Sequence, residues 1–152
     1  MKKSDIFAAK NKYHKNMKKE KQESIENPIM ESRRYIDNAR NVLQNYAILD
    51  TETRCYNDRK YVRAAGHYLW SGVLIILDAT FHVNEKKGRI GIDDYRKAVG
   101  PRDRKLLALV NNAYDILHLN MGYDGVLNKK VCDEGFLIAN EIIDRCGALM
   151  PS

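Results

Sequence analysis

The sequence predicts an all-α protein, a four-helix up-and-down bundle with one short extra helix and a basic N-terminal extension. Apolar residues recur at helical spacing in four long segments, and proline, glycine and capping residues separate these segments. No stretch alternates as a surface strand does. A chain of 152 residues is long enough for one domain with its own core. We expect the extension over residues 1–26 and the bundle domain over residues 27–152.

The extension is rich in lysine. Residues 1–26 contain eight lysines and four acids, whereas residues 27–152 contain 18 basic and 16 acidic residues, so most of the net charge of +6 lies in the extension. With few apolar residues to bury, this segment is typical of a solvated, partly helical tail. Lysine runs also neutralise phosphates, so the lysines of residues 2–21 leave open a contact with nucleic acid or with an acidic partner.

The first long helix is expected from Pro28 to about residue 49. Asn27-Pro28 marks its start, because proline suits the first helical turn. Apolar residues then recur along one face. Residues 50–57 are expected to form a loop, and Asp58 is expected to cap the next helix.

The central helix is expected over residues 61–83. Large and small residues alternate along one seam of it: Val62, Ala65, Leu69, Gly72, Ile76, Ala79 and Val83. A helix that is apolar nearly all round is buried in the middle of a protein. Its uncharged run, residues 64–77, is shorter than the roughly 20 apolar residues of a membrane span, so we expect no membrane contact.

Three further helices follow. A short one is expected over residues 94–99, with Asp93 as its cap. A long one is expected over residues 103–121, with Gly122 as its left-handed C-terminal residue. The last is expected to start after Asn128 and to end near Gly147.

Several classes of function are disfavoured by missing patterns. The cysteines, Cys55, Cys132 and Cys146, have no metal-binding spacing, and their odd number suggests reduced thiols in a cytoplasmic protein. We expect no signal peptide, because Lys2 and Lys3 are followed by Ser4-Asp5 and not by an apolar core of 7–15 residues. There is no Gly-x-Ser-x-Gly turn and no Gly-rich loop ending in Gly-Lys-Ser/Thr.

The segment YVRAAGHYLWSGVLIILDA, followed by DDYRKAV and RKLLALVNNAYDILH, resembles HEPN-type helical bundles over residues 30–147. It resembles more closely a small, uncharacterised family of HEPN-like bacterial proteins. HEPN proteins include metal-independent ribonucleases, toxins paired with nucleotidyltransferase antitoxins, and inactive binding modules. Their nuclease signature is an arginine, four to six residues, and a histidine. No histidine of this sequence completes that signature, since Arg63 stands only four positions before His67. The resemblance therefore implies no catalytic residue.

Six polar residues on two helices form the candidate ligand-binding set. On the central helix, spacings of four, seven and four place four of them on one side, and the next long helix adds two that are three apart. The set is His67, Ser71, Asp78, His82, Asp115 and His118. A cation held by the last four is one interpretation. The other is that Asp78 accepts hydrogen bonds from His82 or Tyr114. Because the Glu-x-x-His pairs of di-metal bundles are missing, we expect neither a metal nor a cofactor.

These patterns favour a non-enzymatic cytoplasmic interaction module. Nine tyrosines, several near apolar stripes, suit a homodimer surface, and the resemblance implies a partner that handles nucleotides or nucleic acids. The alternatives are a degenerate HEPN ribonuclease or toxin–antitoxin component, and a small metal-binding bundle.

Overall fold

The computed structural model describes residues 3–150, with the side chains of residues 3–17 and 27–150. It is mostly helical, as predicted. The elements in chain order are α1 (Lys3–Glu26), α2 (Pro28–Asn45), β1 (Leu49–Asp50), β2 (Cys55–Tyr56), α3 (Arg59–Phe81), η1 (Val83–Glu85), α4 (Ile92–Val99), α5 (Arg104–Ala113), η2 (Tyr114–Tyr123) and α6 (Lys129–Leu149).

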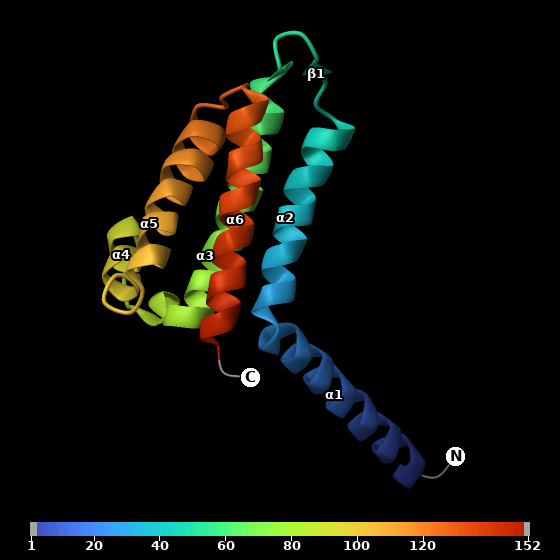
Figure 1. The fold of residues 1–152 in the computed structure, drawn as a ribbon. Helices are drawn as coiled ribbons and strands as arrows, with labels where there is room; N and C mark the ends of the chain where they lie inside the picture. The colour runs from blue at the N-terminus through green and yellow to red at the C-terminus, as the bar shows by residue number, and fades with distance from the viewer. Residues whose placement is uncertain (1–2, 151–152) are drawn as a thin grey trace.

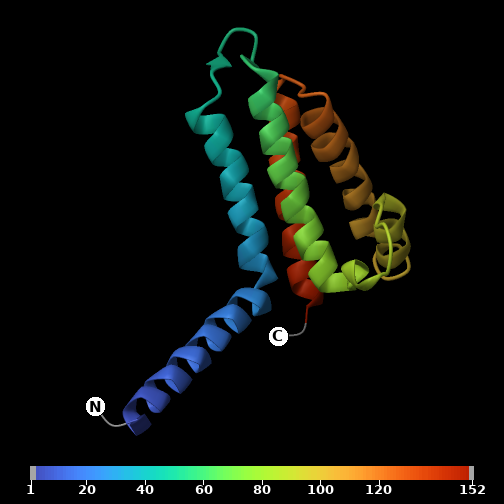
Figure 2. The same cartoon turned by 180° about the vertical axis from the view of Figure 1, so that it is seen from behind.

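Helix α3 is the centre of the fold, as its apolar pattern predicts. It contacts α2 on one side and both η2 and α6 on the other, and these helices lie side by side in Figures 1 and 2. Short α4 packs across the end of α5. The residues of α3 that are buried are Val62, Ala65, Gly66, Leu69, Gly72, Val73, Ile76, Leu77 and Thr80. By length and composition α3 would also pass as a membrane span, a test that the buried core helix of a soluble protein meets equally well.

Two glycines of α3 allow neighbouring backbones to approach closely. A Cβ added at Gly66 would lie 2.5 Å from the backbone nitrogen of Gly122 in η2. A Cβ at Gly72 would lie 3.1 Å from the carbonyl oxygen of Ser32 in α2. Gly72, a small position of the predicted seam, and Gly66, which lies outside the seam, therefore both serve helix crossings, at which a larger side chain would push the helices apart.

The predicted helix starts are largely confirmed. Asn27, Asp58 and Asn128 each accept a hydrogen bond in the first turn of the following helix, from Met30 N (3.2 Å), Lys60 N (3.0 Å) and Lys130 N (2.8 Å). Such caps satisfy N–H groups that have no partner within the helix.

Three local predictions are wrong. The segment expected as the loop 50–57 contains a two-strand hairpin, in which Leu49 pairs with Tyr56. Helix α4 starts at Ile92, and its first turn is fixed by Asp94, which accepts a hydrogen bond from the Gly91 nitrogen at 2.8 Å, rather than by Asp93. Gly122 does not end its helix in a left-handed conformation but lies inside η2.

The helix predicted over residues 103–121 changes its winding halfway. It is α-helical as α5 and continues as the π-helix η2 from Tyr114 to Tyr123. Gly135 of α6 lies so close to η2 that an added Cβ would be 2.8 Å from Met121 Sδ. The π-helix is therefore enclosed by α3 and α6, which both approach it through glycines. π-helices are rare, and most are single turns within α-helices, so a ten-residue run is unusual.

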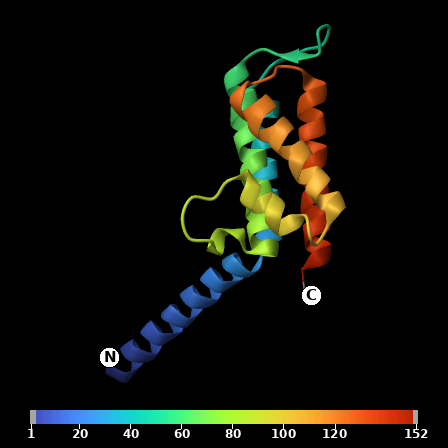
Figure 3. The same ribbon diagram turned by 90° about the vertical axis from the view of Figure 1, so that its left-hand side faces the viewer.

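Helix α1 runs away from the rest of the molecule. Beyond the junction at Asn27-Pro28 it extends from the end of the helical body that holds the C-terminus, and all three views show it without a neighbour along most of its length (Figures 1–3). The hairpin lies at the opposite end of the body (Figure 3). The expected tail is therefore one continuous helix, while the side chains of residues 18–26 lie outside the described set.

Candidate functional site

Asp78 fastens α3 to α4. Its carboxylate accepts a hydrogen bond from the Tyr95 hydroxyl at 2.9 Å, and neither His82 nor Tyr114 is its partner. Partial burial raises the pKa of Asp78, while hydrogen bonds from Tyr95 and from the Asn84 backbone oppose that shift. The Asp78 carboxylate therefore takes part in a contact between two helices of the fold.

His82 ends α3 in the left-handed conformation, with φ of 57°. Its backbone N–H donates to the Asp78 carbonyl at 2.8 Å, whereas its ring turns to solvent, with Nδ1 3.3 Å from Glu85 Oε1. A non-glycine residue with positive φ is uncommon. Asp78 and His82 are therefore one helical turn apart and joined by a backbone hydrogen bond, but their side chains have different partners.

The other predicted residues also lie apart. His67 is exposed beside Gly122, Ser71 is half-buried on α3, and Asp115 is exposed on η2. Among the described side chains, those of residues 3–17 and 27–150, no three His, Cys, Asp or Glu residues are grouped so as to hold a metal ion.

His118 joins an aromatic cluster between α3 and η2. Its ring centroid lies 5.8 Å from that of Trp70 and 5.2 Å from that of Tyr114. The guanidinium of Arg96 lies 5.5 Å from the Tyr114 ring centroid, and its Nε donates to Asn111 at 2.8 Å. His118 Nδ1 is buried without a described hydrogen-bond partner. We read the cluster as packing that joins α3, α4 and η2.

Arg63 hydrogen-bonds to the end of η2. It is the arginine that stands four positions before His67, one residue short of the HEPN nuclease signature. Its Nε donates to the carbonyl of Tyr123 at 3.1 Å, and Arg59 donates to the carbonyl of Asp124 at 3.0 Å. Both guanidinium groups satisfy carbonyls at the end of the π-helix.

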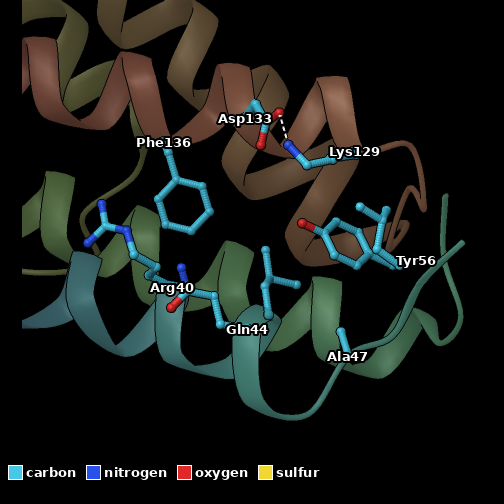
Figure 4. Close-up of a pocket in the computed structure, with 9 residues that line it drawn as sticks. Arg40, Gln44, Ala47, Tyr56, Lys129, Asp133 and Phe136 are labelled. Carbon is cyan, nitrogen blue, oxygen red and sulfur yellow. Dashed lines mark hydrogen bonds and ion pairs between the residues drawn. The ribbon is translucent and has the colours of Figure 1, made fainter. Parts of the chain in front are cut away.

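A pocket that no sequence pattern indicated lies between α2, the hairpin and α6. It has a volume of about 530 Å³ (Figure 4). Helix α2 and the hairpin provide one wall, and the first two turns of α6 provide the other. The lining residues are Arg40, Leu43, Gln44, Ala47, Leu49, Tyr56, Lys129, Asp133 and Phe136.

The pocket has a charged group at each end. Arg40 lies over the ring of Phe136, with 5.5 Å from Cζ to the ring centroid, and it also pairs with Asp37 at 3.0 Å. At the other end Lys129 pairs with Asp133 one helical turn later (Figure 4). Burial, and then the charges of neighbouring groups, raise the pKa of Tyr56. Its hydroxyl therefore remains a donor near neutral pH.

A second exposed feature is the apolar stripe of α1. Ile6, Ala9, Tyr13 and Met17 recur at spacings of three and four and so share one face. Three of them are large and exposed, at 44% for Ile6, 64% for Tyr13 and 50% for Met17. Lys10, Lys12 and Lys15, all exposed, accompany this stripe.

Comparison with known proteins finds a family and a related structure, both without an assigned function. The model of a family described as a domain of unknown function, DUF5618, matches residues 27–148. A solved structure of a protein of unknown function from Dyadobacter fermentans is similar, with 36% identity and a TM-score of 0.77. The similarity covers 82% of this chain and 98% of that one. A search of curated proteins finds no match. The family match leaves out residues 1–26.

Proposed function

Because the chain belongs to the DUF5618 family, to which no activity is attached, we propose its function from its surfaces: a non-enzymatic, homodimeric interaction module. In this proposal the body is a HEPN-like up-and-down bundle, and α1 of each copy docks on the body of the other. The observation that supports it most is the apolar stripe of α1, whose large side chains Ile6, Tyr13 and Met17 are exposed in the single copy. Apolar side chains arranged in a stripe at helical spacing are typical of a docking face.

The outer face of α6 is the complementary surface. Glu134, Leu137 and Glu141 recur at spacings of three and four and are all exposed, with Leu137 at 60%. Among the described residues neither glutamate has an ion pair, whereas the nearby Asp133 and Asp144 pair with Lys129 and Arg33. An apolar residue between two available carboxylates suits a helix that carries an apolar stripe and lysines.

Symmetry strengthens this contact. Two copies related by a twofold axis would make the contact twice, which doubles the buried area.

The bundle is then a platform for a further partner. The resemblance of residues 30–147 to HEPN proteins supports a cytoplasmic partner that handles nucleotides or nucleic acids.

The proposal is tested by exchanging the charges of the two faces in the full chain. Replacing Lys10, Lys12 and Lys15 by Glu should weaken the dimer at least about tenfold, and so should replacing Glu134 and Glu141 by Lys. Combining all five substitutions should restore it, because the opposite charges then face each other again. Native mass spectrometry and sedimentation velocity measure the populations of monomer and dimer.

The matched control reverses three exposed lysines of the body, Lys87, Lys97 and Lys105, which alters net charge equally and should leave the dimer unchanged. A wild-type chain that stays monomeric would refute the proposal. If that monomer instead binds single-stranded RNA with an affinity that falls steeply between 50 and 200 mM salt, α1 is a nucleic-acid arm.

A further inference from the structure

The pocket between α2, the hairpin and α6 has the size and the chemistry of a small-molecule site. Its volume of about 530 Å³ lies within the roughly 300–1,000 Å³ that is usual for ligand pockets. It lies on a different side of α6 from the Glu134–Glu141 face, because Phe136 and Asp133 turn toward α2 and the hairpin (Figure 4). A ligand here would therefore be independent of the proposed dimer.

The centre of the pocket is apolar. Leu43 forms part of the floor and is only 5% exposed, and Ala47, Leu49 and Phe136 are half-buried around it. The methylene groups and rings of these residues can cover the apolar part of a ligand. Arg40 lies over Phe136 at the edge and places a planar cation beside this surface, where it can stack on a flat group.

The polar groups of the lining are mainly hydrogen-bond donors. Lys129, Arg40, the Tyr56 hydroxyl and the Gln44 amide can all donate to a ligand. The single acid of the lining, Asp133, is already paired with Lys129. Helix α6, 21 residues long, begins at Lys129, so its positive end adds to the field at the same place. Arg40 is paired in turn with Asp37, which lies outside the lining, so the lining itself holds two cations against one acid. This net charge of +1 and the neutral donors favour a ligand that accepts hydrogen bonds and carries negative charge.

We propose that this pocket binds a small molecule that joins an aromatic or aliphatic body to a single anionic group. The anion lies at the end formed by Lys129 and Tyr56, and the body covers Leu43 and the Phe136 ring. Arg40 closes the opposite end. We expect the ligand to be held and not transformed, because Asp133, the one carboxylate of the lining, is engaged by Lys129.

A pair of fluorescent probes tests the proposal with the full chain. The first is 8-anilinonaphthalene-1-sulfonate, an aromatic anion, and the second is its neutral counterpart N-phenyl-1-naphthylamine. The anion should bind with one-site saturation and at least about tenfold more tightly than the neutral probe, because a hydrogen bond to a charged group is worth at least that factor. Equal affinity for the two probes would overturn the proposal.

Variants then locate the probe. Lys129→Gln should weaken binding of the anion about tenfold and leave binding of the neutral probe unchanged, whereas Lys130→Gln, at the exposed neighbour that does not line the pocket, should alter neither. Gln44→Trp, a substitution at an exposed position of α2, should fill the pocket and abolish binding of both probes while the melting temperature stays within the error of the wild type. If Gln44→Trp folds and still binds the anion with wild-type affinity, the probe lies elsewhere and the proposal fails.

Discussion

The crossing of α3 and η2 at Gly66 can be tested by adding a single methyl group. In Gly66→Ala the new Cβ would lie 2.5 Å from the nitrogen of Gly122, 2.9 Å from its Cα and 2.7 Å from Met121 Cβ. None of these atoms lies at the flexible end of a side chain, so the two helices must separate. Because two of the contacts are with backbone atoms, the cost of overpacking lies in the upper part of its usual range, at about 2–3 kcal/mol, against a gain of about 1 kcal/mol in helix propensity. We expect a net loss of about 1–2 kcal/mol.

The assay is urea unfolding followed by circular dichroism, with thermal unfolding as a second measurement. The expected loss lowers Tm by about 2–8 °C for a domain of this size. Gly147→Ala is the matched control, since its Cβ would meet only the end of Ile29, at 3.3 Å. The free energy of unfolding of this control should rise by up to about 1 kcal/mol. If Gly66→Ala is as stable as the wild type or more stable, the backbones are not in contact and the central role given to α3 is wrong.

Two further predictions concern buried titratable groups. Burial raises the pKa of Asp78 in the folded state, so the folded chain binds its proton more tightly and stability falls as pH rises through that pKa. Asp78→Asn, which still accepts from Tyr95, should therefore raise Tm at pH 7 relative to the wild type, and the gain should disappear below about pH 4, as thermal melts across pH would show. Burial also raises the pKa of Cys132 to about 12 and of Cys146 to about 11. Ellman's reagent at pH 8 should therefore label half-exposed Cys55 rapidly and the other two thiols only on unfolding, and three fast thiols would contradict the packing.

The helices were predictable because each has a local cause in the sequence. The apolar seam of α3 and the caps Asn27, Asp58 and Asn128 operate within a few residues, and the structure contains all of them. The hairpin at residues 49–56 was missed because two-residue strands are too short to show alternation. The π-helical winding of η2 was missed because its buried apolar residues Leu117 and Met121 are four apart, a spacing that suits an α-helix as well as the wider turn of a π-helix.

The site was less predictable because spacing identifies a face and not a partner. Asp78 and His82 do share one side of α3, yet the partner of Asp78 is Tyr95, brought by α4 after the chain has turned back. Arg40 and Lys129 line the same pocket although they are far apart in the sequence, and no local pattern links residues at such a separation. Only the packing of α2 against α6 brings them to one cavity.

The most direct test of the proposed function is sedimentation velocity of the full chain over a range of protein concentrations and at two salt concentrations. We expect a concentration-dependent dimer that weakens as salt rises, because charged faces contribute to its contact. The chain with Lys10, Lys12 and Lys15 changed to Glu should sediment as a monomer, and the additional change of Glu134 and Glu141 to Lys should restore the dimer. A wild-type monomer at every concentration, or a dimer that neither set of substitutions alters, would contradict docking of α1 on α6.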